Sequence, residues 1–353
     1  MQKDTYRVIE SCYHCEQLRT NGIKPEVKAN LDLFLPGDFP TANYDKKFQY
    51  STIHWGQLKL FFSELYLLTN YAEKGNVVVY VGAAPGIHIP TLQYMFAKLG
   101  LYYYLVDPQP ILVPVTKKTK VVQDYYNTEN FVKWLDSIGK TNKDVIFISD
   151  IRRGARKDYP TDKINDQKLM EDNLLQQKWV VDLQPKVAML KFKLPLFEPP
   201  SVNYLDGQIM FPVWGRDQTT ESRLIVTDVK FRDYNCNLYN GQMVRFNTHE
   251  RAFVYKVANL EIINFPGIDK CFDCTASIAI LSDYKEKFDK RVSIYGLLSN
   301  IISDIGGTTN SLLNRQSENK IALMPNILTE REIHSVHRHY INSLLGDYSH
   351  LSY

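Results

Sequence analysis

Four charged residues stand at the ends of short apolar runs, where a strand would end or begin. Asp107 follows "YYYLV" and Asp150 follows "VIFIS", whereas Lys191 closes "VAMLK" and Glu221 opens "ESRLIV". In an open parallel sheet, ligands bind beyond the carboxyl ends of the strands, so we expect these groups to gather at one edge. Carboxylates at such an edge can accept hydrogen bonds from ligand hydroxyls. A lysine there either takes part in proton transfer or extends its ammonium group from the rim into solvent.

A glycine-containing turn follows the apolar run 77–81 in "VVVYVGAAPGIHI". Gly82 and Gly86 allow the backbone to pass close to a ligand. The turn does not match the GxGxxG of nicotinamide-binding proteins, and no Gly-Lys-Ser/Thr follows it as in a phosphate loop. It therefore favours a ligand such as S-adenosylmethionine, which needs close backbone approach but no phosphate cradle. Asp107 would then accept bonds from two ribose hydroxyls, although an Asx turn before Pro108 also accounts for it.

Alternating strands and helices are predicted to position these residues. The predicted strands are 77–81, 102–106, 120–123, 145–149, 187–191, 224–227 and 260–264. The predicted helices are 56–71, 87–99, 128–138 and 166–182, with more helix after about residue 275. In the first helix the apolar side chains share one face and Lys59 lies off it. This alternation predicts an α/β, doubly wound, mostly parallel sheet, and the weaker helical pattern after Glu221 indicates an antiparallel edge.

The length and composition suit one large domain with additions. The chain has 353 residues, of which 44% are hydrophobic and 23% charged, so a sizeable core can form. We expect an irregular N-terminal arm over residues 1–50, the main domain over 51–275, and a helical extension over 276–353 that packs on the same domain. No internal repeat or low-complexity tract is present.

The charge balance and the termini indicate the compartment but not the partner. The net charge of +3 permits nucleic-acid binding without requiring it. No apolar run approaches the roughly 20 residues that cross a bilayer, and the N-terminus lacks a signal-peptide core. We therefore expect a cytoplasmic protein that contacts no membrane and whose cysteines are reduced.

Two CxxC pairs, Cys12/Cys15 and Cys271/Cys274, raise the question of a metal. Brought together, the four thiolates would make a tetrahedral zinc site. The pairs lie at opposite ends of the chain, however, and neither carries the glycines typical of a zinc knuckle. We therefore predict structural cysteines and no metal.

Five segments in chain order resemble a known family: "GQLKLFFSELYLL", "VVYVGAAPGIHI", "VIFISDIR", "LKFKLP" and "ESRLIV". From about residue 50 to about residue 265, the chain resembles the poxvirus cap-specific mRNA 2'-O-methyltransferases, which double as the small subunit of viral poly(A) polymerase. It resembles more loosely the Rossmann-like RNA ribose methyltransferases. Their Lys-Asp-Lys-Glu tetrad corresponds here to Lys59, Asp150, Lys191 and Glu221. The resemblance implies a Rossmann-like S-adenosylmethionine-dependent methyltransferase fold and a viral source.

The tetrad suits methylation of the ribose 2'-oxygen of the first transcribed nucleotide of capped mRNA. That hydroxyl is a weak acid and a poor nucleophile, so it must be aligned behind the sulfonium methyl while a base accepts its proton. A lysine can be that base only where burial or a second cation lowers its pKa. We expect Lys191 to be the base and Lys59 the neighbouring cation. Asp150 and Glu221 would orient the two amines.

The resemblance also implies a set of cofactor contacts. The implied residues are Gln57, Gly82, Gly86, Asp107, Asp150 and Arg152. Gln57 and the glycines would line the methionine part and Asp107 would hold the ribose. Arg152 would meet a phosphate or the cofactor rim. Gln109 stands where the poxvirus enzymes have an arginine, which puts one contact in doubt.

For the cap, the family sandwiches 7-methylguanine between two aromatic rings, with acidic side chains on the base edge. A cationic purine stacks strongly on such rings. The candidate residues here are Tyr44, Phe197, Glu198 and Glu250. Leu196 occupies one aromatic position, so Phe197 would have to substitute, and ordinary packing explains Tyr44 and Phe197 equally well. The RNA body would meet basic clusters such as "RRGARK" through its phosphates, although that run also suits a solvated loop.

Two other functions remain open from the sequence. The chain could be a regulatory or processivity subunit that binds a poly(A) polymerase catalytic subunit, with methyl transfer secondary or lost. It could also methylate ribosomal or transfer RNA, but the arm and the helical tail favour the cap enzyme. Capped mRNA is therefore the expected partner.

Overall fold

A seven-stranded sheet forms the centre of the protein. The computed structural model of the chain describes residues 26–43, 56–152, 162–215, 219–257, 260, 270–301 and 305. The sheet has the order β4-β3-β2-β5-β6-β9-β8. Its strands are β2 (Val77–Val81), β3 (Tyr102–Val106), β4 (Thr119–Val122), β5 (Val145–Ser149), β6 (Val187–Phe192), β8 (Gln208–Met210) and β9 (Ser222–Val226).

The sheet is mostly parallel and doubly wound. The pairs from β4 to β6 are parallel, whereas β9 is antiparallel to both β6 and β8. From β2 the chain moves outward through β3 to β4, then returns and moves the other way through β5 to β6. The topological switch therefore lies between β2 and β5, where a ligand crevice is expected. The predicted Rossmann-like sheet with an antiparallel edge is confirmed.

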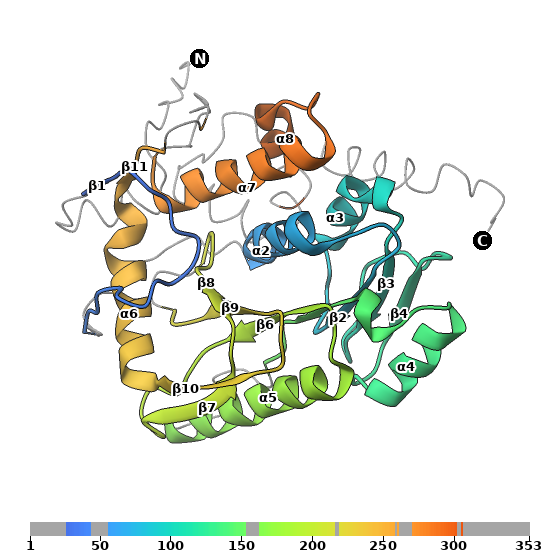
Figure 1. The fold of residues 1–353 in the computed structure, drawn as a ribbon, viewed down its shortest axis with the longest axis horizontal. Coiled ribbons are helices and arrows are strands. Elements are labelled where there is room, and N and C mark those ends of the chain that lie inside the picture. The colour runs from blue at the N-terminus through green and yellow to red at the C-terminus, as the bar shows by residue number, and fades with distance from the viewer. Residues whose placement is uncertain are drawn as a thin grey trace, which may run out of the picture.

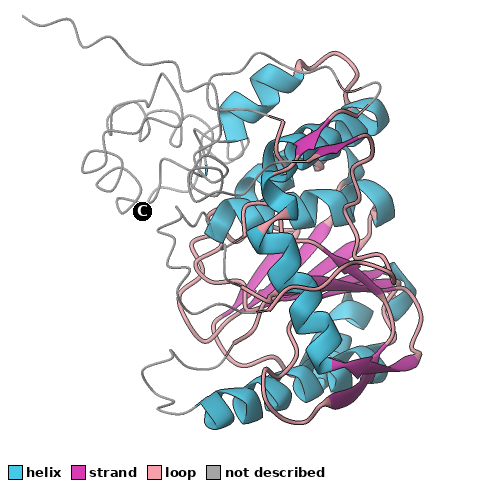
Figure 2. Ribbon diagram, turned by 90° about the vertical axis from the view of Figure 1, so that its left-hand side faces the viewer, coloured by secondary structure: helices cyan, strands magenta, loops and turns pink. Residues whose placement is uncertain are grey.

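Helices cover both faces of this sheet, as Figures 1 and 2 show. One side carries α2 (Gly56–Tyr71), α3 (Ile89–Met95), α7 (Phe272–Phe288) and α8 (Ile294–Ile301). The other side carries α4 (Thr128–Ser137) and α5 (Asp162–Leu183). Helix α6 (Cys236–Thr248) flanks the antiparallel end, and two small ribbons pair β7 (Ser201–Leu205) with β10 (Phe231–Asn235) and β1 (Val27–Lys28) with β11 (Val254–Tyr255). None of the described helices combines the length and apolarity that a membrane span requires.

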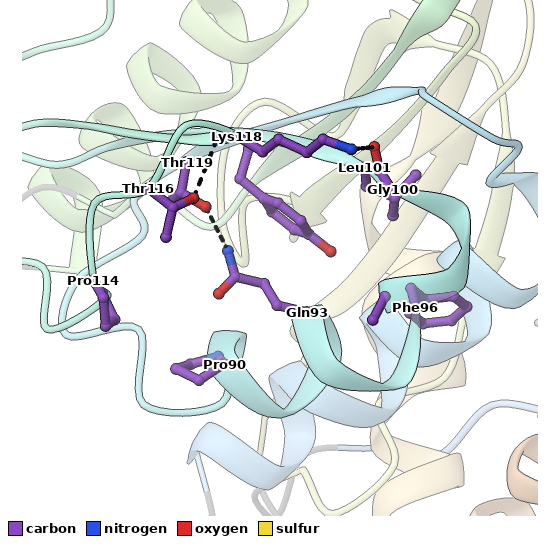
Figure 3. Close-up of a pocket in the computed structure, with 11 residues that line it drawn as sticks. Pro90, Gln93, Phe96, Gly100, Leu101, Pro114, Thr116, Lys118 and Thr119 are labelled. Atoms are coloured by element: carbon purple, nitrogen blue, oxygen red, sulfur yellow. Dashed lines mark hydrogen bonds between the residues drawn. The ribbon is translucent and has the colours of Figure 1, made fainter. Parts of the chain in front are cut away.

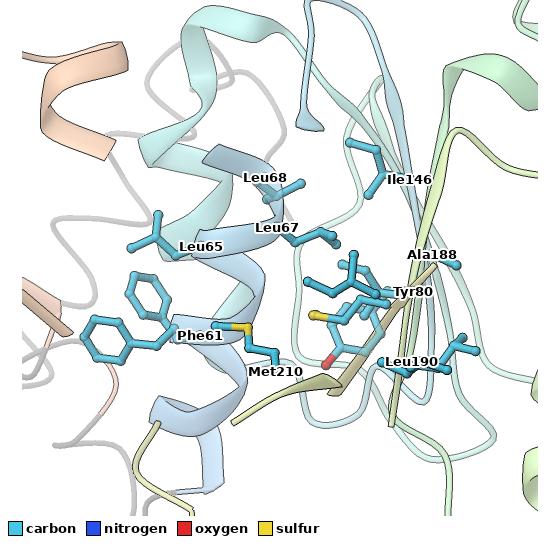
Figure 4. Close-up of a cluster of buried hydrophobic side chains, with 14 of the residues drawn as sticks. Phe61, Leu65, Leu67, Leu68, Tyr80, Ile146, Ala188, Leu190 and Met210 are labelled. Carbon is cyan, nitrogen blue, oxygen red and sulfur yellow. The ribbon is translucent and has the colours of Figure 1, made fainter. Parts of the chain in front are cut away.

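Helix α2 is buried on nearly all sides, which matters because it carries Lys59. Figure 4 shows Leu67 on the side of the sheet, while Phe61 and Leu65 lie on the opposite side of the helix. These side chains belong to one continuous core that also includes strand residues such as Tyr80 and Ile146. The apolar face predicted from the sequence therefore accounts for only half of what the helix buries, because α7 packs on its other side.

Most predicted strands appear in place, and the differences are local. β2, β3 and β5 begin and end as predicted, while β4 and β9 start one and two residues earlier. The predicted helix 87–99 is two pieces, α3 and a 3-10 turn at Ala97–Leu99, which ends at Gly100 with a positive φ of 58°. In the predicted strand 260–264 only residue 260 is described, and it forms no strand. The predicted division into arm, domain and extension stays a prediction.

The sequence did not predict α6, β7, β8 or β10. The α6 sequence "CNLYNGQMVRFNT" holds three asparagines and a glycine, which are poor helix formers, so its propensity is low. It starts where Asn235 caps it by accepting a bond from the Leu238 N–H. Burial of Tyr239, Met243 and Phe246 then stabilises the helix through tertiary packing.

Gly82 allows the β2 turn to touch the chain beyond β5. Its φ is +84°, and a Cβ there would lie 3.0 Å from the Asp150 carbonyl carbon and oxygen. Gly139 has a similar φ of +68°, but a Cβ there would meet nothing within 4 Å. We expect Gly139→Ala to lower the free energy of unfolding by about 1–2 kcal/mol through backbone strain alone. Gly82→Ala should cost clearly more, measured by urea unfolding, and equal losses would contradict the close contact.

Candidate functional site

Strand register brings the predicted charged residues together at the carboxyl edge of the sheet. β5 and β6 are in parallel register, so Asp150 and Lys191 lie side by side just where β5 ends. Lys191 pairs in turn with Arg223 of the antiparallel β9. Glu221 precedes Arg223 by two residues and therefore faces the same side of the extended chain. Lys59 reaches this side from α2.

Three ion pairs join the four predicted tetrad residues into one cluster. The Lys59 Nζ lies 2.5 Å from the Glu221 Oε1. The Lys191 Nζ lies 3.3 Å from the Asp150 Oδ1 and 3.6 Å from the Glu221 Oε2. Their side chains are between 10% and 18% exposed, so the cluster is nearly buried but still reachable. One ionic site thus forms from side chains of α2, of β6, of the residue that follows β5 and of the residue that precedes β9.

A fifth charged residue, Arg223, was not predicted. Its guanidinium lies 2.8 Å from the Asp150 Oδ1 and 2.9 Å from the Glu221 Oε1, and so bridges the two carboxylates. Arg223 is only 2% exposed. An arginine inside the apolar run "SRLIV" was the available signal, because a charged residue in a buried strand needs a partner.

Burial and charge together shift the proton affinities in this cluster. Burial lowers the pKa of Lys59 below its usual value, even though Glu221 opposes the shift. Burial also works to raise the pKa of Glu221, but the three neighbouring cations outweigh it and hold that pKa well below its usual range. The pKa of Asp150 is likewise lowered, because Lys191 and Arg223 overcome its burial. Lys59, Lys191 and Arg223 therefore share two ionised carboxylates.

Polar side chains of α5 hold the backbone that follows Lys191. The Gln176 Nε2 donates to the Lys191 carbonyl at 3.1 Å, and the Asn173 Nδ2 donates to the Lys193 carbonyl at 2.9 Å. The Asp166 carboxylate accepts the backbone N–H groups of Leu196 and Phe197 at 3.0 and 2.9 Å. Fixing this segment also fixes the direction in which the lysine side chain leaves the strand.

The predicted cofactor residues flank the same edge. Gly86, like Gly82, has a positive φ, of 72°. The Asp107 Oδ2 accepts from the Ala84 N–H at 3.1 Å, and its Oδ1 accepts from the Gln109 N–H at 2.8 Å. The second bond is the Asx turn considered from the sequence. Each carboxylate oxygen keeps a further lone pair, so a ribose hydroxyl could still donate to Asp107.

Gln57 and Arg152 also lie next to the cluster. The Gln57 Oε1 is 2.8 Å from the Nδ1 of His88, a residue to which the sequence assigned no role. Arg152 donates to the carbonyls of Ile151 and Lys191 at 3.1 and 3.3 Å. Arg152 thus supports the backbone of the lysine, and its part in phosphate or cofactor binding stays a prediction.

The predicted cap residues lie on different segments of the chain. Phe197 is 58% exposed, and Glu198 beside it is exposed as well. Glu250 is buried, and its carboxylate lies 3.3 Å from Arg245 and 3.7 Å from Lys28. Tyr44 lies outside the described residues. The arrangement of these side chains around a base therefore stays a prediction.

Some sequence features lie outside the described residues. Within "RRGARK" only Arg152 is described, and Cys12 and Cys15 are not. Cys271 and Cys274 are buried at the start of α7, where the Cys271 sulfur caps the helix by accepting the Cys274 N–H at 3.5 Å. Among the residues with described positions, no group of three or more His, Cys, Asp or Glu side chains could hold a metal ion.

A separate cavity of about 210 Å³ lies between α3 and the start of β4. Figure 3 shows Gln93 of α3 reaching toward Thr119, to which its Nε2 donates at 3.0 Å. Tyr103 near the amino end of β3 also lines this cavity. The tetrad lies at the carboxyl ends of the strands, so this cavity is not part of the candidate site.

Comparison with known proteins places these observations in context. A family model described as poly A polymerase regulatory subunit matches residues 38–302. Two curated relatives are each named cap-specific mRNA (nucleoside-2'-O-)-methyltransferase. The fowlpox virus (strain NVSL) protein is 30% identical, with the match covering 43% of this chain and 52% of the relative. The myxoma virus (strain Lausanne) protein is 31% identical, with 62% and 66% covered.

The chain thus spans between about half and just under two thirds of the length of these relatives. A solved structure of bluetongue virus VP4, described as a multifunctional RNA-capping production line, aligns with a TM-score of 0.35 and 9% identity. That alignment covers 71% of this chain and 45% of VP4. A likeness of this size carries no argument about function.

The lowered pKa of Glu221 makes folding sensitive to acid. Its folded pKa lies below the ordinary value of 4.5, so the stability it contributes is present above that pH and is lost as pH falls through the folded value. Glu221→Gln should lower stability at pH 7 and make the free energy of unfolding depend less on pH below about 4.5. Urea unfolding at several pH values measures this.

The exposed Glu286, which pairs with Lys290, provides the control. Glu286→Gln should leave the acid dependence like that of the wild type. If Glu221→Gln kept the wild-type acid dependence, the cluster would not hold an ionised Glu221.

Proposed function

The chain belongs to the poly A polymerase regulatory subunit family, and on that premise we propose that it methylates the ribose 2'-oxygen of the first transcribed nucleotide of capped mRNA. The observation that carries the proposal is the direct contact among Lys59, Asp150, Lys191 and Glu221. The two curated poxvirus relatives, named as cap-specific methyltransferases, support the same reaction.

S-adenosylmethionine is the proposed methyl donor, and the residues at the edge fit it. Gly82 and Gly86 both have a positive φ, which bends the chain sharply where β2 ends and would set the backbone of the turn against a ligand. Asp107 keeps lone pairs for the ribose hydroxyls. Gln57 stands at the start of α2, next to the turn, where it would meet the methionine part. The bound cofactor supplies an electrophilic methyl group on a sulfonium centre.

Within this proposal, Lys191 accepts the proton of the 2'-hydroxyl at its Nζ. Arg223 and Lys59 hold the two carboxylates at 2.5–2.9 Å, whereas the contacts of Lys191 are longer, at 3.3–3.6 Å. Lys191 is therefore the amine that the carboxylates hold least tightly. Arg223 and Lys59 already supply two positive charges for the two carboxylates, so Lys191 is not needed to hold them.

The cap would bind beside this site. Phe197 presents an exposed ring, and the Asp166 carboxylate holds its backbone amide, so the ring is displayed from a fixed position. A cationic 7-methylguanine would stack on that ring. Glu198, Glu250 and Tyr44 remain the proposed partners for the base edge and for the second face.

A second candidate function is that of a polymerase subunit. The family description supports binding to a poly(A) polymerase catalytic subunit, alone or together with methyl transfer. Co-purification with such a subunit would test this function separately. The relatives are poxvirus proteins, so we propose a viral source and a cytoplasmic site of action.

Methyl transfer from labelled S-adenosylmethionine to a short RNA tests the leading proposal. We expect transfer to the first 2'-oxygen of an RNA with a 7-methylguanosine cap and none to the same RNA uncapped. Lys191→Arg keeps the charge but cannot accept a proton, so the rate should fall by about 100-fold or more. Lys59→Arg keeps the neighbouring cation and should cost less than about tenfold.

Binding of S-adenosylhomocysteine should be unchanged in both variants, which separates the chemical step from folding. Equal losses in Lys191→Arg and Lys59→Arg would refute the assignment of the base. Transfer without cap dependence would indicate another RNA substrate. No transfer by a protein that binds the cofactor would favour the polymerase-subunit function.

A further inference from the structure

Helix α6 donates hydrogen bonds to the backbone that leads into Glu221. The Tyr239 hydroxyl donates to the carbonyl of Thr220, the residue before Glu221, at 2.6 Å. The Asn247 Nδ2, about two turns further along α6, donates to the Thr219 carbonyl at 2.7 Å. The Thr219 side chain in turn accepts the Glu221 N–H at 3.0 Å. A backbone carbonyl can only accept, so the direction of the two bonds from α6 is fixed.

The Tyr239 hydroxyl also meets the strand that carries Lys191. Strands β6 and β9 are antiparallel, and their register pairs Phe192 with Ser222. The hydroxyl lies 3.4 Å from the Phe192 carbonyl oxygen and 2.9 Å from the Ser222 Oγ. One oxygen atom of α6 therefore contacts both strands, at residues directly next to Lys191 and Glu221.

Two asparagines of α6 contribute through their N–H groups, although they suit a buried helix poorly. Asn240 donates its Nδ2 to the Pro195 carbonyl at 2.7 Å, just as Asn247 donates to the Thr219 carbonyl. Asparagine forms helix poorly, and the Oδ1 atoms of both residues are buried without a hydrogen-bond partner in the part of the chain that the structure describes. Leucine would form helix better and would bury no oxygen. Breaches of local sequence rules of this kind are expected at functional sites.

We infer that Tyr239, supported by Asn247, is a positioning residue that fixes the Glu221 carboxylate between Lys59 and Arg223. Both cations contact the same oxygen atom of that carboxylate, Oε1, at 2.5 Å from the Lys59 Nζ and 2.9 Å from the Arg223 guanidinium. A shift of the Glu221 backbone would therefore disturb both contacts at once. The inference rests on the proposed function, because it takes methyl transfer as the reaction that the cluster serves. It goes further in giving α6 a part in that reaction.

Removal of a single oxygen atom tests the inference. Tyr239→Phe keeps the ring and deletes the hydroxyl that holds the Thr220 carbonyl. In methyl transfer to an RNA with a 7-methylguanosine cap, we expect its kcat to fall by about tenfold, as the loss of one buried hydrogen bond implies. The KM values for the RNA and for S-adenosylmethionine should stay within about twofold. A purely structural role would lower the stability of the fold without this division between kcat and KM.

Tyr204→Phe is the matched control. Tyr204 and Tyr239 are both buried, and both pack on the Phe192 ring, with ring centroids 5.8 and 5.2 Å away. The Tyr204 hydroxyl, however, has no hydrogen-bond partner among the residues whose positions are described. Tyr204→Phe should therefore leave kcat unchanged. It should not lower the free energy of unfolding either, because deleting a buried hydroxyl without a partner removes its desolvation penalty.

The NMR titration of Lys59 compares the same variants without any methyl transfer. Burial lowers the pKa of Lys59, and Glu221 is the neighbour that raises it most. A Glu221 carboxylate that moves away would raise it less, so the Lys59 midpoint should fall in Tyr239→Phe and stay at the wild-type value in Tyr204→Phe. The other charged groups that act on Lys59 are Arg223, Lys191 and Asp150, which neither variant alters.

The inference requires both changes in Tyr239→Phe and neither in Tyr204→Phe. If the two variants had equal kcat values and equal Lys59 midpoints, the inference would be wrong while the proposed function stood. A fall in kcat without a shift of the midpoint would also contradict it, because Tyr239 would then act by a route other than Glu221. If the wild type transferred no methyl group to any RNA, the proposed function would fail. A lower Lys59 midpoint in Tyr239→Phe would still show that the hydroxyl holds Glu221.

Discussion

Two nearly buried carboxylates bridged by a single arginine are the interaction on which the candidate site depends. Arg223 lies 2.8 Å from Asp150 and 2.9 Å from Glu221. Without a cation between them, the carboxylates would repel each other where little water can screen them, and one would take up a proton. With Arg223 in place both stay ionised, and together they hold two lysines in addition.

This arrangement dictates much of the surrounding fold. β5, β6 and β9 must stay in register, since a slip of one residue would turn Arg223 to the other face of the sheet. Helix α2 must be buried between the sheet and α7 because Lys59 has to reach Glu221. The Asp150 backbone also lies 3.0 Å from where a Cβ on Gly82 would stand, so the ionic cluster and the glycine turn occupy one continuous edge.

The sequence predicted those parts whose signal is local. Runs such as "VVVYV" and "VIFIS" are short and β-branched, and they became β2 and β5 as expected. Asp150 and Lys191 could be placed at one edge because parallel strands end on the same side. The partners of Arg223 could not be assigned in this way, since they come from contacts between elements distant in the chain. For the same reason α6 was missed, because its stability depends on packing and its own residues form helix poorly.

The titration of Lys59 by NMR tests the account of the ionic cluster most directly, since the claim is that burial at this edge of the sheet outweighs the neighbouring carboxylates. Lysine labelled at its ε-carbon would give one signal for Lys59, identified by its absence in Lys59→Arg. The account predicts a titration midpoint below the ordinary value of 10.5, because burial outweighs the attraction of Glu221. A midpoint at or above 10.5 would contradict it, because Lys59 would then hold its proton at least as tightly as a lysine in water does.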